Sequence, residues 1–244
     1  MEIFPAEDYG QMSGMAAQLV IEQVKAKPGS VIGLVTGGTT EGMYRQLVES
    51  YRQGQVSFGQ VKTVNTDEYY KIAPDNDQSY QYYMQQRFFS QVDIKAENTL
   101  LVDGLAADPA EECARYDRAL VETGPMDLLI LGMGGNGHIA FNEPQPDCFE
   151  RNTHLVKLTD STIHANSRFF ERWEDIPKYA ITMGIGPMMA AKKIVFLVSG
   201  EGKSDMLQQA LHGPVTPMVP ASILQFHQNL TVIADKAALT KVVL

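Results

Sequence analysis

The sequence predicts an α/β fold with an open, mostly parallel sheet and helices on both faces, a Rossmann-like, doubly wound architecture. Short apolar runs with the length of buried strands alternate with segments of helical period along the chain. Alternating strands and helices favour parallel pairing, since each helix returns the chain to the same edge of the sheet. Neither an internal repeat nor a long linker divides the sequence. We therefore expect one domain over residues 1–244.

The expected elements follow in a regular order. Apolar residues at three- and four-residue spacings predict a first helix over residues 7–27, which Pro28 and Gly29 end. Strands are then expected at residues 31–35, 61–65, 98–102, 126–130, 192–198 and 230–234. Further helices are expected after the turn at residues 36–40, near residues 78–89, over residues 108–121 and near residues 204–211. Only one helix, and no strand, is predicted before residue 31.

The segment at residues 159–179 interrupts this rhythm. It is polar and holds the chain's one tryptophan, Trp173. Long excursions between regular elements are often lids that close over an active site. A surface helix that covers a sheet edge would have the same composition, so both interpretations stay open at this point.

Composition excludes several classes of partner. The net charge is −9 and no run of lysine and arginine is present, which argues against a nucleic-acid partner. No apolar run reaches the ~18 residues of a membrane span, and the acidic N-terminus does not resemble a signal peptide. The five histidines lack the spacing of a metal site. We expect a cytoplasmic enzyme without a bound metal.

The glycine-rich loop that follows the strand at residues 126–130 carries the strongest functional signal. Four glycines deliver His138, and Glu143 follows five residues later. Ligands in open α/β sheets bind beyond the carboxyl ends of strands, where a histidine and a carboxylate can move protons at neutral pH. The spacing of the glycines also fits a dinucleotide-binding loop, but Pro144 and Pro146 disfavour the helix that such a loop needs. A buried histidine satisfied by a carboxylate is the structural alternative.

A second glycine-rich turn lies between the first predicted strand and the next helix. Its residues are Thr36, Gly37, Gly38, Thr39 and Thr40. Backbone amides at the start of a helix bind anions such as phosphate, and the threonine hydroxyls can add hydrogen bonds. The structural alternative is a tight turn between strand and helix, which needs glycine only for its dihedral angles and binds no anion.

Charged residues follow other strands. Asp67, with Glu68 beside it, comes directly after the strand at residues 61–65 and has the position of a general base. Position alone favours a capping role for Asp67 and a structural or electrostatic role for Glu68. Arg168 and Lys203 could together hold a phosphate, although either alone is more often a solvated surface charge.

Four sequence blocks together resemble the glucosamine-6-phosphate deaminase family over nearly the whole chain. They are Leu-Gly-x-Gly-x-Asn-Gly-His-Ile-Ala-Phe-Asn-Glu-Pro at residues 131–144, Thr-Gly-Gly-Thr at 36–39, Asn-Thr-Asp-Glu-Tyr at 65–69 and Ala-Asn-Ser-Arg-Phe-Phe at 165–170. The resemblance implies conversion of glucosamine 6-phosphate and water to fructose 6-phosphate and ammonia, in amino-sugar catabolism. It implies no metal and no organic cofactor. The small-molecule partner would be an amino-sugar phosphate.

The resemblance also implies a role for each matching residue. His138, oriented by Glu143, would assist opening of the pyranose ring, and Asp67 would move a proton from C2 to C1. Arg168, Lys203 and the turn at residues 36–40 would hold the phosphate. Asn136 stands where many members have an aspartate that contacts the histidine, so His138 would depend more on Glu143 here. The chain also ends before the extension of the hexameric, allosterically activated members, which leads us to expect a monomer.

Other functions fit parts of the pattern. A 6-phosphogluconolactonase is similar in fold, but its loop typically continues Gly-His-Thr-Ala-Ser-Leu-Phe-Pro, where this chain has Gly-His-Ile-Ala-Phe-Asn-Glu-Pro. A sugar-phosphate isomerase would use Asp67 in the same proton transfer without releasing ammonia. A sugar-phosphate sensor would usually carry a DNA-binding helix-turn-helix, for which the segment before residue 31 offers no room. The deaminase is the favoured interpretation.

Overall fold

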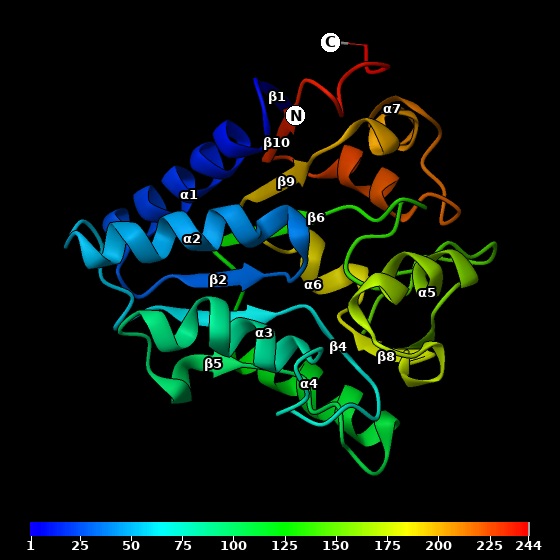
Figure 1. The fold of residues 1–244 in the computed structure, drawn as a ribbon, viewed down its shortest axis with the longest axis horizontal. Helices are drawn as coiled ribbons and strands as arrows, with labels where there is room; N and C mark the ends of the chain where they lie inside the picture. Colours follow the sequence, from blue (N-terminus) through cyan, green and yellow to red (C-terminus); the bar gives the residue numbers. More distant parts are fainter. Residues whose placement is uncertain (244) are drawn as a thin grey trace.

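A seven-stranded parallel sheet forms the centre of the protein (Figure 1). The computed structural model describes residues 1–243. In spatial order the strands are β1 (Glu2–Ala6), β10 (Leu230–Asp235), β9 (Ile194–Val198), β6 (Leu128–Gly132), β2 (Val31–Leu34), β3 (Lys62–Asn65) and β5 (Thr99–Leu100). The inner strands are buried along almost their whole length, as apolar strands covered on both faces must be.

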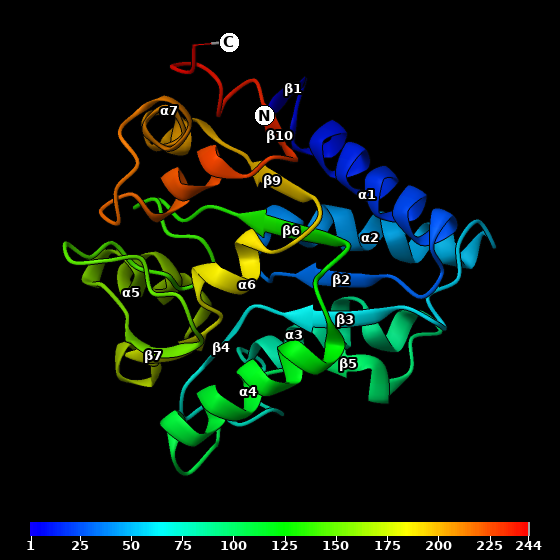
Figure 2. The same cartoon turned by 180° about the vertical axis from the view of Figure 1, so that it is seen from behind.

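Helices cover both faces of this sheet (Figures 1 and 2). One face carries α1 (Tyr9–Ala26), α2 (Gly38–Arg52) and α3 (Tyr80–Arg87), and the other carries α4 (Pro109–Thr123) and α6 (Ile185–Met189). The remaining helices are α5 (Asp160–Asn166) and α7 (Ser204–His212). Short 3₁₀ turns occupy Phe89–Gln91, Ala96–Asn98, Ser167–Phe169, Trp173–Asp175, Glu201–Lys203 and Pro220–Phe226. The predicted α/β class is confirmed.

The strand order fixes where a ligand can bind. Strand β2 pairs with β3 on one side and with β6 on the other. The chain first builds outward from β2 to β3 and β5, and then returns to β6 on the opposite side. The connections that leave the carboxyl ends of β2 and β6 therefore diverge, which opens a crevice between them. The turn at residues 36–40 and the histidine loop follow these two strands.

A second, three-stranded antiparallel sheet was not predicted. It consists of β4 (Asp67–Tyr69), β8 (Tyr179–Thr182) and β7 (His154–Lys157), with β8 in the middle. Strands of three or four residues are too short to show a period of two in the sequence. The sheet packs with α5 around a small apolar cluster of its own, separate from the main core. It holds Asp67 at the start of β4.

Several predicted boundaries were wrong. The chain begins with strand β1 and not with a helix; β1 is an edge strand whose residues are mostly exposed, so it lacks an apolar pattern. Strand β6 starts and ends two residues later than predicted; Asp127 directly precedes it, and its carboxylate pairs with Lys27 and Lys192. The strand expected at residues 98–102 is reduced to the two residues of β5.

Every helix within residues 1–243 is too short or too polar to cross a lipid bilayer.

Candidate active site

A cavity of about 680 Å³ opens at the carboxyl edge of the parallel sheet. Its lining includes the turn at residues 36–40, Asp67, His138, Arg168 and Lys203, which are distant in the sequence. They meet because the carboxyl ends of parallel strands share one edge of a sheet. The structure therefore brings these predicted site residues together around one space, while Asn136 and Glu143 do not line it and reach it only through His138.

The glycine-rich turn forms the start of helix α2. Gly37 has φ +111°, a conformation that only glycine adopts without strain, and open space faces both Gly37 and Gly38. The amides of Gly38 and Thr39 begin the helix and make no hydrogen bond within the described residues. Such free amides at a helix N-terminus attract anions.

The threonines of this turn differ in their surroundings. Thr40 is fully buried, and its hydroxyl contacts the carbonyl oxygens of Val35 and Gly37 at 3.3 and 3.2 Å. Its hydroxyl therefore stabilises the backbone of the turn and is not available to a ligand. The hydroxyl of Thr36 is buried and has no hydrogen-bond partner within residues 1–243, while Thr39 Oγ1 lies 3.4 Å from Lys203 Nζ. Thr36 and Thr39 keep hydrogen-bonding capacity for a ligand.

Two cations stand beside the turn. The pKa of Lys203 is lowered to about 8, first by burial and then by the charge of the nearby Arg168 guanidinium, while the charge of Asp235 opposes both effects. The Arg168 guanidinium lies 4.7 Å from the centroid of the Phe169 ring. Arg168 and Lys203 repel each other, and a bound anion would relieve this repulsion and accept hydrogen bonds from the free amides. This corner of the cavity therefore suits a phosphate group.

Asp67 lies at another wall of the cavity and is only 6% exposed. The pKa of its carboxyl is raised to about 7: burial is the largest cause and the charge of Glu68 adds to it, while the hydrogen bond from the Thr66 hydroxyl at 3.2 Å opposes them. Within residues 1–243 no cation pairs with it. A carboxyl that titrates near neutral pH can both accept and release a proton.

The contacts of Glu68 differ from those of Asp67. Its carboxylate accepts the backbone N–H groups of Tyr69, Tyr80 and Gln81 at 2.8, 2.9 and 2.8 Å. Burial raises its pKa to about 7, while these three hydrogen bonds lower it. Tyr80 and Gln81 begin helix α3, so Glu68 accepts two of its first N–H groups, while the N-cap residue Ser79 accepts the N–H of Tyr82 at 2.9 Å. The capping role considered for Asp67 belongs to its neighbour.

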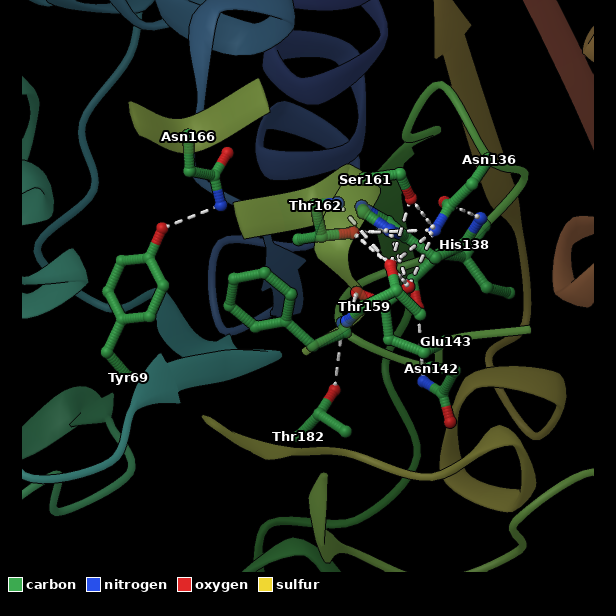
Figure 3. A network of polar contacts seen from close by, with 12 residues as sticks. Tyr69, Asn136, His138, Asn142, Glu143, Thr159, Ser161, Thr162, Asn166 and Thr182 are labelled. Atoms are coloured by element: carbon green, nitrogen blue, oxygen red, sulfur yellow. Dashed lines mark hydrogen bonds and ion pairs between the residues drawn. The ribbon is translucent and has the colours of Figure 1, made fainter. Parts of the chain in front are cut away.

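His138, which lines the cavity, forms a polar pair with Glu143, which does not line it (Figure 3). His138 Nδ1 lies 3.5 Å from Glu143 Oε2, and Asn136 Nδ2 donates to the same oxygen at 2.7 Å. Asn136 Oδ1 in turn accepts the backbone N–H of His138 at 3.2 Å. Nε2 of His138 has no hydrogen bond within the described residues, so the pattern assigns the ring proton to Nδ1 and leaves Nε2 for a ligand.

Glu143 is about as buried as Asp67, but its pKa is shifted in the opposite direction. Burial opposes its ionisation, but the hydrogen bond and charge of His138, with hydrogen bonds from Thr162 and Asn136, hold its pKa below the usual value. The loop also folds tightly: a Cβ at position 134 would lie 2.3 Å from His138 Nε2. Glycine is required there for the imidazole to lie against the loop.

Sequence reasoning missed the hydroxyl groups around this pair. Thr159 Oγ1 contacts Glu143 Oε2 at 3.1 Å, and Thr162 Oγ1 lies 3.4 Å from His138 Nδ1 (Figure 3). Ser161 Oγ lies 3.3 Å from Asn136 Nδ2. The sequence did carry a signal, since a threonine before Asp-Ser-Thr is a typical helix N-cap, and Thr159 caps α5. The signal could not show what lies opposite the cap.

The segment at residues 159–179 borders the cavity. It contains α5 and two 3₁₀ turns, and its members Asn166, Arg168, Phe169 and Phe170 line the space. Asn166 Nδ2 donates to the hydroxyl of Tyr69 at 2.8 Å, which ties the segment to β4. The segment thus lies against the small sheet and faces the site. Within residues 1–243 no group of three histidine, cysteine or acidic side chains is placed to hold a metal ion.

Comparison with known proteins decides the family. The sequence model of the family described as glucosamine-6-phosphate isomerases/6-phosphogluconolactonase matches residues 8–233. This chain belongs to that family. A glucosamine-6-phosphate deaminase of Clostridioides difficile (strain 630) is 47% identical over 99% of this chain and 96% of that protein. One of Lachnoclostridium phytofermentans is 48% identical over 96% of this chain and 98% of that protein.

Solved structures of the family agree with the fold. One described as a monomeric glucosamine-6-phosphate deaminase superposes with a TM-score of 0.96 at 38% identity, over 99% of this chain and 100% of that chain. The 6-phosphogluconolactonase of Trypanosoma cruzi superposes with a TM-score of 0.81 at 16% identity, over 100% and 97%, a likeness that shows the fold alone. The predicted resemblance and the prediction of an enzyme are confirmed.

Proposed function

We propose that the protein is a glucosamine-6-phosphate deaminase that acts in amino-sugar catabolism. It converts glucosamine 6-phosphate and water to fructose 6-phosphate and ammonia. One observation carries the proposal: a single cavity joins a buried aspartate that titrates near neutral pH, a histidine with a free Nε2, and a cationic anion site. The relatives named glucosamine-6-phosphate deaminase, 42–48% identical over nearly the whole chain, support the same reaction.

Ring opening is assigned to His138. The pyranose form must lose the proton of its O1 hydroxyl and gain one on the ring oxygen before the aldehyde is free. His138 Nε2 is the uncommitted nitrogen in the cavity and can carry this proton. Glu143 stays anionic, holds Nδ1, and stabilises the imidazolium that forms. Asn136 fixes the carboxylate by a neutral hydrogen bond.

Isomerisation is assigned to Asp67. In the open-chain sugar its carboxylate takes the proton from C2 while the aldehyde oxygen is protonated, which gives an enol-type intermediate that still carries the nitrogen on C2. Return of the proton to C1 leaves a protonated imine at C2. Water adds to this carbon, and the resulting carbinolamine expels ammonia and leaves the ketone of fructose 6-phosphate. A pKa near 7 suits both halves of this transfer, since the group must be basic enough to accept the proton and acidic enough to return it.

The phosphate is assigned to the turn and the two cations. Amides of Gly38 and Thr39, with Arg168 and Lys203, would hold the phosphate oxygens and so fix C1 and C2 relative to Asp67. A bound dianion would also raise the pKa of Lys203 again and keep it charged. Fixed distances between these groups then select a sugar of one length.

A coupled assay tests the proposal. Purified protein is mixed with glucosamine 6-phosphate, and ammonia and fructose 6-phosphate are followed together. Equal amounts of both products are expected. Fructose 6-phosphate formed only from a hydroxyl sugar phosphate, or hydrolysis of 6-phosphogluconolactone without ammonia release, would contradict the proposal and assign an isomerase or a lactonase.

We further infer that the chain acts as a monomer formed by one domain. The structure with the TM-score of 0.96 is described as monomeric, and it covers this chain almost end to end. Light scattering coupled to gel filtration is expected to give a mass near 27.0 kDa. A mass that is a multiple of this value at micromolar concentration would contradict the inference.

A further inference from the structure

Three tyrosines surround the glycine-rich turn, each from a different helix. The hydroxyl of Tyr44 in α2 donates to the carbonyl oxygen of Val35 at 2.7 Å. The hydroxyl of Tyr83 in α3 donates to the carbonyl oxygen of Gly37 at 3.1 Å. Tyr9 in α1 donates to the carbonyl oxygen of Gly38 at 2.7 Å. Three carbonyls of one short turn are therefore bound by protein hydroxyls.

An anion site requires this arrangement of peptide groups. A peptide plane that rotates exchanges its N–H group for its carbonyl oxygen, which repels a phosphate oxygen. Because each carbonyl is held on a tyrosine, the planes cannot rotate without losing a hydrogen bond. The amides of Gly38 and Thr39 remain free of protein partners within residues 1–243. The buried hydroxyl of Thr36, also without a partner there, lies in the same turn.

We propose that Tyr9, Tyr44 and Tyr83 are positioning residues. They hold the turn at residues 36–40, and the carbonyl of Val35 that precedes it, in the anion-binding conformation. The inference rests on the proposed function, since it concerns the phosphate corner of the same site. None of the three is assigned to the chemistry at C1 and C2. They act on the phosphate through the backbone.

The packing of helix α1 supports this role for Tyr9. A Cβ on Gly42 would lie 2.3 Å from Ser13 Oγ, so only glycine allows α1 to approach the first turns of α2 so closely. This approach puts the Tyr9 hydroxyl between two backbone groups, because it also accepts the N–H of Gly42 at 2.7 Å. The hydroxyl thus spans the first turn of α2.

Tyr44 and Tyr83 stay protonated donors at neutral pH. Burial raises the pKa of Tyr44 and of Tyr83 well above the usual value. For Tyr83 the charge of Glu41 acts in the same direction, while Thr40 and Arg87 oppose it. Removing a hydroxyl should therefore weaken phosphate binding by a constant factor at every pH in the working range.

Calorimetric titration with inorganic phosphate tests the inference without turnover. Tyr9→Phe and Tyr83→Phe are each expected to weaken phosphate binding about three- to tenfold, the range expected for one lost hydrogen bond, and the double variant by about the product. Tyr82→Phe is the matched control: it lies on the same helix, and its hydroxyl makes no hydrogen bond within residues 1–243. Its phosphate affinity should equal that of the wild type.

Kinetics separate positioning from simple structural support. With glucosamine 6-phosphate, Tyr9→Phe and Tyr83→Phe should raise KM by the same factor while kcat and the pH profile of kcat stay unchanged. Phosphate affinity within twofold of the wild type in the double variant would overturn the inference, whatever its melting temperature. Absence of phosphate binding by the wild type would overturn it as well. Ammonia release tests the proposed reaction separately, so the two can fail independently.

Discussion

Two carboxylates at the site are almost equally buried and are nevertheless tuned in opposite directions. Asp67 is 6% exposed and Glu143 is 7% exposed. Burial raises the pKa of Asp67 to about 7, because one threonine hydroxyl is its only hydrogen-bond donor within residues 1–243. The pKa of Glu143 is lowered instead, because His138, Thr162 and Asn136 surround it with donors and positive charge.

The difference shows that hydrogen-bond donors, and not burial, separate the pKa values of the two groups, and this separation fits the roles that we propose for them. A proton-transfer base must change its charge during the reaction, so it needs few donors. The partner of an imidazole must keep its charge while the ring gains and loses a proton, so it needs many. Pairs of titratable groups whose surroundings separate their pKa values mark acid–base roles in other enzymes.

The largest effect is expected at Asp67. Asp67→Asn keeps the volume and the hydrogen bond from Thr66 but removes the base, so kcat should fall by about 10³. Binding of inorganic phosphate should stay within twofold of the wild type. Asp75→Asn, an exposed aspartate in the loop after β4, is the control and should retain full activity. A kcat for Asp67→Asn near the wild-type value would remove Asp67 from the mechanism.

A smaller effect is expected at His138. His138→Gln should lower kcat for cyclic glucosamine 6-phosphate by about 10². The 5-deoxy analogue, which cannot close a pyranose ring, should lose much less, because it bypasses the step that needs the imidazole. Steady-state rates with both substrates make the comparison. Equal losses on the two substrates would show that His138 does not act in ring opening.

The free energy of unfolding should change with pH in opposite directions for variants of the two carboxylates. The folded-state pKa of Asp67 is raised, so its ionisation costs stability as pH rises from 4 to 7, and Asp67→Asn should gain about 2–3 kcal/mol relative to the wild type over that interval. The folded-state pKa of Glu143 is lowered, so its stabilisation is present above the unfolded pKa and lost in acid. Glu143→Gln should therefore be most destabilised at neutral pH. Urea unfolding at pH 4 and pH 7 measures the Asp67 variant, and unfolding at pH 3 and pH 7 measures the Glu143 variant. Parallel trends of the two variants relative to the wild type would refute the comparison.

The smallest effect is expected at Glu68. Its charge raises the pKa of Asp67, so Glu68→Gln should move the acid limb of the kcat/KM profile to lower pH by about half a unit. The glutamine oxygen can still accept the N–H groups of Tyr69 and Tyr80, and only the hydrogen bond from Gln81 is lost. Glu97→Gln, the same substitution at an exposed position, should leave the limb in place. An acid limb that moves to higher pH in Glu68→Gln would contradict the assigned interaction.

The strand-and-helix alternation predicted most of the parallel sheet and, through it, most of the site. The turn at residues 36–40, Asp67, His138 and Lys203 each follow a predicted strand, and parallel strands end at one edge. Their convergence on one cavity therefore followed from topology. Pro144 and Pro146 led to the prediction that the histidine loop does not continue into the helix of a dinucleotide-binding loop. The structure shows no helix directly after Gly137.

Contacts between distant segments could not be predicted. The small sheet joins residues 67–69 to residues 179–182, and no local pattern specifies that pairing. The hydroxyl of Thr159 was visible as a helix cap, but its contact with Glu143 depends on how α5 docks. That Glu68, and not Asp67, accepts the amides of α3 depends on how α3 packs against β4, so the sequence could not show it.

Carbon NMR of carboxyl-labelled protein tests the central comparison most directly. Aspartate and glutamate carrying ¹³C in their side-chain carboxyl groups are followed from pH 3 to pH 9, with Asp67→Asn and Glu143→Gln used to assign the two signals. Asp67 should titrate with a midpoint near 7, and Glu143 should stay ionised down to below its ordinary value of 4.5. A midpoint of Asp67 near 3.8, or of Glu143 above 4.5, would contradict the division of work between them.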